Sequence, residues 1–180
     1  RCDSAARQGR GGGKSAMEIE SRRVIAFCGN PNVGKTTLYN RLTGKREHTG
    51  NWTGKTVGCA KAVVKGTNCL AVDLPGTYSL DARSPEEGVT RDFLNSGEAN
   101  AAVIVCDASS LERNLILALS VANTGIPSVM CLNLIDEARR GGTKINTNRL
   151  SELVGMPVAV TCATNGSGVR ELIQMAKEAC

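Results

Sequence analysis

The residues that most constrain the fold are the eight from Gly29 to Thr36, which read GNPNVGKT. They match the spacing G-x-x-x-x-G-K-[S/T], in which two glycines let the backbone wrap so that successive N–H groups point at a bound phosphate. The apolar run VIAFC precedes them, and a pattern typical of a helix follows from Gly34 to Leu42. A strand, a glycine-containing loop and a helix in this order predict a phosphate-binding loop.

Each part of this loop has a predicted chemical role. Lys35 supplies a mobile cation to the β- and γ-phosphates of a nucleotide, and the Thr36 hydroxyl is a candidate Mg²⁺ ligand. The helix that starts near Gly34 adds the positive end of its dipole to the anion site. The nucleotide contacts expected from this segment are Gly29, Asn30, Pro31, Asn32, Val33, Gly34, Lys35, Thr36 and Thr37.

Strand and helix patterns alternate along the rest of the chain. Residues 99–109 and 126–136 are continuous apolar runs, typical of strands buried on both faces of a parallel sheet. Residues 56–66 and 68–76 indicate an antiparallel hairpin, and residues 156–163 a last strand. Apolar residues recur at helical spacing in 110–125 and in 169–176. These patterns predict a doubly wound α/β domain whose sheet is mostly parallel, with one antiparallel edge strand and helices on both faces.

The chain divides into a leader, residues 1–22, and one expected compact domain, residues 23–180. The leader is rich in glycine and has no hydrophobic period, so we expect it to be disordered or foreign to the native protein. The net charge of +5 is concentrated ahead of the first apolar run, in Arg1, Arg7, Arg10, Lys14, Arg22 and Arg23. A basic leader without interleaved aromatics does not indicate a nucleic-acid partner. No apolar run approaches the roughly 20 residues that cross a bilayer, so we expect this piece to be soluble.

The eight cysteines are scattered and form no C-x-x-C pair. Six of them fall in or beside predicted strands, and we interpret them as small buried hydrophobic residues in a reducing cytosol. They are Cys28, Cys59, Cys69, Cys106, Cys131 and Cys162. His48, the only histidine, has no second histidine with which to share a metal.

The magnesium site also needs an acidic residue at the end of a neighbouring strand, and Asp73 in AVDLPG ends a predicted strand. Gly76 in the same segment can present its backbone N–H to a γ-phosphate, and Leu74 and Pro75 complete the contact. Alone, D-x-P-G also describes a strand-ending turn, but the phosphate loop favours the metal interpretation. Asp107 also ends a strand, and we interpret it as a helix-capping or structural acid.

The segment NLID, Asn133 to Asp136, is the predicted base reader. A carboxylate at Asp136 can accept hydrogen bonds from N1–H and from the exocyclic amine of guanine, whereas adenine offers no such pair of donors. N-x-x-D alone is also compatible with a helix N-cap. At this place in the expected fold, guanine recognition by Asn133, Leu134 and Asp136 is favoured.

These motifs together resemble the N-terminal G domain of the FeoB family, bacterial ferrous-iron transport proteins within the Ras-like GTPases. GNPNVGKTTLYNRLTG resembles the family's first motif, TGNWTGKTV its switch I, and DLPGTYSL with SPEEGVTRDFL its switch II. The resemblance covers residues 24–179. Its most discriminating parts are GNW, DLPGTYSL and Leu134, which stands where other G domains carry lysine.

The resemblance implies further site residues. Thr56, with Gly54 and Lys55 before it, matches the switch I threonine that closes on Mg²⁺ and the γ-phosphate. Asn32 matches an asparagine that holds a monovalent cation in potassium-activated G proteins; a turn-forming role in the loop is an equally good alternative. The implied catalytic set is Asn32, Lys35, Thr56 and Gly76, and the implied Mg²⁺ ligands are Thr36, Thr56 and Asp73.

Two departures from the common Ras-like pattern affect the expected chemistry. Thr77 stands where a water-orienting glutamine is often found, so intrinsic hydrolysis should be slow. The last guanine motif reads Cys162, Ala163, Thr164 in place of an initial Ser-Ala. Backbone N–H contacts to guanine survive this change, whereas a serine hydroxyl contact is lost.

The implied protein binds GTP and GDP with Mg²⁺ and K⁺, hydrolyses GTP, and gates or regulates Fe²⁺ uptake. Its implied partners are a helical regulatory domain and a membrane permease domain of the same full-length protein, at the cytoplasmic face of the bacterial inner membrane. A freestanding GTPase of ribosome or RNA maturation is the alternative, but the chain has no basic RNA-binding module beyond its leader. A small P-loop ATPase or kinase would leave NLID and Thr56 unused. The oligomeric state stays open.

Overall fold

The computed structural model of the chain describes residues 22–44, 48–51, 58–81 and 84–180. The leader, apart from its last residue, lies outside these ranges, as does the segment that holds Gly54, Lys55 and Thr56.

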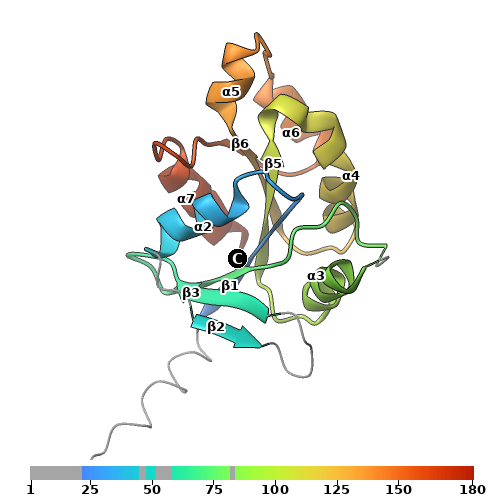
Figure 1. The fold of residues 1–180 in the computed structure, drawn as a ribbon, viewed down its shortest axis with the longest axis vertical. Coiled ribbons are helices and arrows are strands. Elements are labelled where there is room, and N and C mark those ends of the chain that lie inside the picture. The colour runs from blue at the N-terminus through green and yellow to red at the C-terminus, as the bar shows by residue number, and fades with distance from the viewer. Residues whose placement is uncertain (1–21, 45–47, 52–57, 82–83) are drawn as a thin grey trace, which may run out of the picture.

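The described residues form a seven-stranded sheet in the order β2-β3-β4-β1-β5-β6-β7 (Figure 1). Five strands, from β4 to β7, run parallel to one another, and β3 runs antiparallel to both of its neighbours. The strands are β1 (Arg23–Gly29), β2 (His48–Asn51), β3 (Gly58–Val63), β4 (Cys69–Asp73), β5 (Ala101–Asp107), β6 (Ser128–Asn133) and β7 (Val158–Val160).

This topology confirms the predicted doubly wound sheet and its β3–β4 hairpin. The antiparallel strand is one place in from the edge, because the short strand β2 pairs with its outer side. The four residues of β2 read HTGN, without the apolar alternation that reveals a half-buried strand, so the pattern gave no sign of it.

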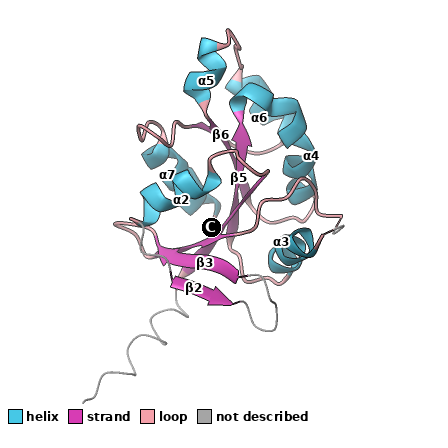
Figure 2. Cartoon of the chain, in the orientation of Figure 1, coloured by secondary structure: helices cyan, strands magenta, loops and turns pink. Residues whose placement is uncertain are grey.

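Helices cover both faces of the sheet, as Figure 2 shows with helices in cyan and strands in magenta. Buried side chains of α2 and α7 pack against Ile25 and Phe27 on one face, and those of α3, α4 and α6 join Ala26 and Cys28 on the other. The helices are α2 (Lys35–Thr43), α3 (Pro85–Asn95), the 3₁₀ turn η1 (Ala108–Ser110), α4 (Leu111–Ala122), α5 (Ile135–Arg140), α6 (Thr147–Val154) and α7 (Val169–Ala179). None of these helices combines the length and the apolar content that crossing a membrane requires.

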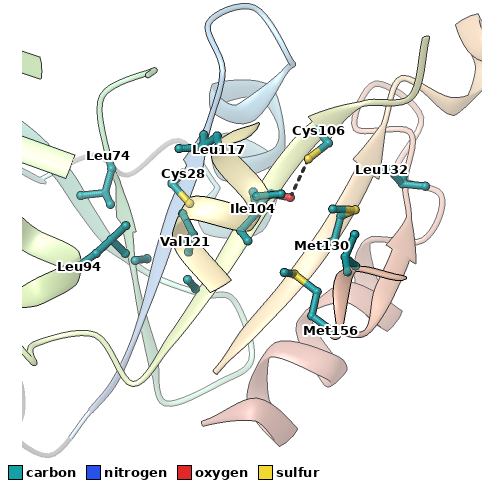
Figure 3. Close-up of a cluster of buried hydrophobic side chains, with 14 of the residues drawn as sticks. Cys28, Leu74, Leu94, Ile104, Cys106, Leu117, Val121, Met130, Leu132 and Met156 are labelled. Atoms are coloured by element: carbon teal, nitrogen blue, oxygen red, sulfur yellow. Dashed lines mark hydrogen bonds between the residues drawn. The ribbon is translucent and has the colours of Figure 1, made fainter. Parts of the chain in front are cut away.

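The core is built from small aliphatic and sulfur-containing side chains, and Figure 3 shows Cys28, Ile104, Cys106 and Met130 together in one part of it. The six cysteines predicted in strands are buried and unpaired. Burial raises the pKa of Cys28 and of Cys131 to about 12, so these thiols stay protonated at neutral pH. Their prediction as buried hydrophobic residues is confirmed.

Candidate functional site

The predicted phosphate-binding loop joins the carboxyl end of β1 to the start of α2. Gly34 has φ 80°, the left-handed region that glycine adopts without strain, and the Leu38 N–H bonds back to the Gly34 carbonyl at 3.0 Å. A Cβ on Gly29 would lie 2.5 Å from the Val105 carbonyl oxygen, so only glycine fits against β5. The loop borders a cavity of about 530 Å³, which is lined by Asn30, Pro31, Asn32, Gly34, Lys35, Thr36, Thr37 and Gly76.

Two predicted loop contacts have side chains that are engaged within the protein. Val33 is buried, and the Asn30 side-chain amide donates to the Arg113 carbonyl at 3.2 Å, tying the loop to α4. Pro31 has no backbone N–H to offer a phosphate. Anion contacts from Asn30 and Val33 would therefore come from their backbone N–H groups, and Pro31 offers none.

Three predicted site residues meet at the loop's entrance to α2. The Lys35 ammonium donates to the Asp73 carboxylate and, at 2.5 Å, to the Leu74 carbonyl oxygen. The Thr36 hydroxyl oxygen lies 3.5 Å from the second carboxylate oxygen of Asp73. Parallel pairing of β1 with β4 produces this meeting, because it sets Asp73 beside Phe27 at the same sheet edge. Hydroxyl and carboxylate oxygens are ligands that Mg²⁺ prefers, so these residues fit the predicted metal.

The segment after Asp73 passes directly beneath the phosphate loop. A Cβ on Gly76 would lie 3.3 Å from three atoms of Pro31, so this glycine permits the close approach. Thr77 is buried; its N–H donates to the Gly29 carbonyl at 3.1 Å and its hydroxyl to the Ser79 carbonyl at 2.6 Å. The Thr77 hydroxyl is therefore committed to the fold and not directed to orienting a water.

Asn133 links the phosphate loop to the last predicted guanine motif. Its side chain is fully buried, and its amide nitrogen donates to the Val33 carbonyl at 2.9 Å. Its amide oxygen accepts from the Thr161 hydroxyl at 3.1 Å and from the Ala163 N–H at 3.0 Å. A Cβ on Gly34 would lie 2.4 Å from this amide nitrogen, so the glycine also makes room for the link. The sequence predicted a base contact here and gave no sign of this linking role.

Asp136 lies in the first turn of α5 and does not cap the helix. The N-cap residue is Leu134, at φ 58°, and no side chain caps the helix there. One carboxylate oxygen accepts from the Cys162 thiol at 3.3 Å, and the other lies 3.4 Å from the Arg140 guanidinium. The Cys162 contact and, less strongly, the Arg140 charge lower the pKa of Asp136. Asp136 is therefore an ionised and accessible acceptor at neutral pH, as base recognition requires.

Cys162 stands at the sequence position expected for a serine, and its thiol donates to the Asp136 carboxylate. It also lies 3.1 Å from the Thr164 hydroxyl. The thiol contact keeps this residue connected to the predicted base reader, which the sequence argument had not foreseen.

One residue that sequence reasoning missed is Arg41, on α2. Its Nε–H donates to the Ala163 carbonyl at 2.6 Å, and its Nη2–H to the Thr164 carbonyl. A single arginine on an exposed helix position carries no sequence signal for a partner more than 120 residues away.

Three further predictions concern Asn32, the switch I residues and Asp107. Asn32 is exposed, borders the cavity and has φ 66°, a conformation asparagine tolerates better than most residues. That geometry supports its turn-forming role, and its cation role stays a prediction. Gly54, Lys55 and Thr56 lie outside the described residues, so the switch I contacts also stay predictions. Asp107 accepts from the Ser109 N–H at 2.8 Å, which confirms it as a capping acid.

Comparison with known families gives a match over almost the whole described domain. The family model for "Ferrous iron transport protein B" matches residues 23–176. The "Fe(2+) transporter FeoB" proteins of Salmonella typhimurium and Escherichia coli are each 42% identical over 155 residues, which is 83% of this chain. The chain spans only 20% of the length of these two relatives.

Solved structures agree with this match. A mutant S. thermophilus NFeoB bound to GDP is 42% identical, with a TM-score of 0.84 over 87% of this chain and 62% of that one. The G domain of the T. maritima FeoB iron transporter is 35% identical, with a TM-score of 0.80 over 88% of this chain and 98% of that one. The fold is therefore that of a P-loop GTPase domain.

Proposed function

Because the chain belongs to the ferrous iron transport protein B family, we propose that it is the GTP-binding and GTP-hydrolysing switch domain of a ferrous iron transporter. The observation that carries the proposal is the meeting of Lys35, Thr36 and Asp73 at one side of the cavity under the phosphate loop. Asp136, joined to Cys162 at the guanine motif, supplies the proposed base reader. Crystal structures of S. thermophilus NFeoB with GDP and with GMPPNP support this nucleotide assignment.

The proposed reaction is in-line attack of water on the γ-phosphorus of GTP. The bond to the β,γ-bridging oxygen breaks, and GDP and inorganic phosphate leave. Lys35 exchanges its contacts with Asp73 and Leu74 for the β- and γ-phosphates, and backbone N–H groups of the loop stabilise the charge that spreads over the γ-phosphate oxygens. Mg²⁺, held by Thr36 and Asp73 with Thr56, supplies charge neutralisation on the β- and γ-phosphates when bound.

The potassium dependence proposed for this reaction concerns Asn32. K⁺ beside its side chain would supply positive charge where other G proteins use an arginine. With Thr77 committed to Ser79, no side chain at that position orients the water, so slow intrinsic hydrolysis is expected.

The proposed output is conformational. Thr56 and Gly76 hold the two switch segments only while a γ-phosphate is present, and hydrolysis releases them. We propose that this change gates or regulates Fe²⁺ uptake by a membrane permease domain of the same protein, through a helical regulatory domain. The relatives are about five times longer than the matched region, which leaves room for both partners. The domain would then work at the cytoplasmic face of the inner membrane.

Nucleotide preference tests the proposal directly. The protein with Mg²⁺ should bind GDP at least about a hundredfold more tightly than ADP, because adenine leaves the Asp136 carboxylate without its pair of donors. Asp136→Asn should lose affinity for GDP and gain affinity for xanthosine diphosphate, whose ring carbonyl accepts from the new amide. Fluorescence titration with mant-nucleotides measures both, and Glu152→Gln on α6 is the matched control. Equal affinity for GDP and ADP in the unsubstituted protein would contradict the assignment.

A further inference from the structure

Arg41 makes two hydrogen bonds to successive carbonyls of one loop. The donors are its Nε–H, 2.6 Å from the Ala163 oxygen, and its Nη2–H, bonded to the Thr164 oxygen. The guanidinium is planar and carries several N–H groups in a fixed fork, so it can bond two neighbouring acceptors at once. Because both acceptors belong to the backbone, this contact is independent of the side chains that the loop carries.

The loop is shaped to receive this side chain. The Gly166 N–H bonds to the Cys162 carbonyl at 2.8 Å and closes a tight turn, in which Gly166 has φ 87°. A Cβ on Gly166 would lie 2.7 Å from an Arg41 guanidinium nitrogen, so any larger residue would displace the arginine or the loop. A glycine thus serves both the turn and the approach of Arg41.

A second anchor holds the same loop from its other side. The Ala163 N–H donates to the buried Asn133 amide oxygen, while the Ala163 carbonyl accepts from Arg41. Asn133 is fully buried, whereas Arg41 is exposed. The contact with Asn133, the inner anchor, therefore forms part of the core. The contact with Arg41, the outer anchor, is the one for which water can compete.

The outer anchor lies at a cavity next to the proposed base site. A cavity of about 600 Å³ is lined by Thr37, Asn40, Arg41, Gly44, Lys65, Ala163 and Thr164. Thr37 also lines the cavity under the phosphate loop, so the two cavities adjoin. The loop of residues 162–166 contacts Asp136 through the Cys162 thiol and is bonded to Arg41 through the Ala163 and Thr164 carbonyls. Movement of this loop would therefore change how a base is held at Asp136.

We propose that Arg41 is a positioning residue that holds this loop closed over the guanine and slows nucleotide release. The proposal rests on the guanine-nucleotide function proposed above. Because Arg41 acts at the base end of the site, its loss should change the release rates of GDP and GTP alike. Because it opposes opening of the loop, its loss should change the dissociation rate more than the association rate.

The test is the dissociation rate of mant-GDP from the protein with Mg²⁺, chased with excess GDP. Arg41→Ala loses both charge-assisted hydrogen bonds and should release mant-GDP about tenfold faster. Arg41→Lys keeps the positive charge but loses the planar set of N–H donors. Its mant-GDP release rate should lie between those of the unsubstituted protein and Arg41→Ala. Arg149→Ala removes an exposed arginine that pairs with Glu152 on α6, and should leave the rate unchanged. A GTP analogue, mant-GMPPNP, should show the same acceleration as mant-GDP.

Two results would overturn the proposal. One is release from Arg41→Ala within about twofold of the unsubstituted protein, a change no larger than ordinary surface substitutions make. The other is a lower urea midpoint of unfolding with an unchanged release rate, which would make Arg41 structural only. Failure of the proposed function is a different result, namely no saturable mant-GDP binding by the unsubstituted protein.

Discussion

At the scale of single residues, the candidate site shows how one side chain can admit two explanations. Asn32 has the left-handed conformation of a turn former and also borders the cavity of the phosphate loop. Substitution by alanine removes the amide and disfavours the conformation at once. Substitution by glycine removes the amide and keeps the conformation.

Asn32→Gly should therefore separate the two roles. If the side chain holds K⁺, GTP hydrolysis by the unsubstituted protein should be about tenfold or more faster in potassium chloride than in sodium chloride, and Asn32→Gly should erase that difference. Phosphate release measured in the two salts gives the ratio, and mant-GDP affinity checks that the loop still forms. Equal rates in both salts for the unsubstituted protein would leave Asn32 with its turn role alone.

At the scale of elements, the helix α3 is connected to the segment that carries Gly76. The Thr90 hydroxyl, fully buried, donates to the Pro75 carbonyl at 3.2 Å, and Gly76 packs against Pro31 on the other side. The segment is therefore held between the phosphate loop and α3. A change at Gly76 on loss of the γ-phosphate would reach α3 through this hydrogen bond.

Thr90→Val should weaken that connection without changing the shape of the core. The loss of one buried hydrogen bond is worth about 1 kcal/mol, so affinity for GMPPNP should fall about fivefold relative to affinity for GDP. The measurement is competition against mant-GDP by each nucleotide. Thr124→Val, which removes a hydroxyl bonded to the Val121 carbonyl at the end of α4, is the matched control. An equal loss for both nucleotides would show that Thr90 supports the fold and not the switch.

The sequence revealed those elements whose signal is local. The strand, loop and helix around Gly29 to Thr36 follow from glycine spacing and hydrophobic pattern, and the structure has them where expected. The helix α3 was not predicted, although Ser84 and Glu87 form a capping box that the sequence contains. The contacts of Asn133 and Arg41 could not be predicted from the sequence, because each joins segments that only the folded sheet brings together.

At the scale of the whole molecule, the parts of the candidate site that lie within the described residues follow the carboxyl ends of parallel strands. The phosphate loop follows β1, Asp73 ends β4, Asn133 ends β6 and Cys162 follows β7. Such a site exists only when all four strands are paired. A nucleotide that binds there binds the folded state and has no comparable site on the unfolded chain.

Binding of a nucleotide at this site should therefore raise the midpoint temperature of thermal unfolding. GDP with Mg²⁺ at about 100 times its dissociation constant should stabilise the domain by about 2.7 kcal/mol. For a domain of this size that corresponds to a rise of about 5 to 10 °C in the unfolding midpoint. Differential scanning fluorimetry measures the shift. ADP at the same concentration should raise the midpoint by about 1 °C or less, and Lys35→Ala should reduce the shift with GDP. A midpoint that does not respond to GDP would contradict the proposed site.

The buried amide of Asn133 also limits how such a domain could diverge. It is bonded both to the loop predicted to bind phosphate, at Val33, and to the loop predicted to contact the base, at Ala163. A substitution there would disturb affinity at both ends of a nucleotide together, so selection could not adjust one end alone. Asp136 is half exposed, and its carboxylate contacts Cys162 and Arg140, so a substitution there would act on base recognition. Natural variation in base preference should therefore accumulate at Asp136 and its neighbours, with Asn133 left in place.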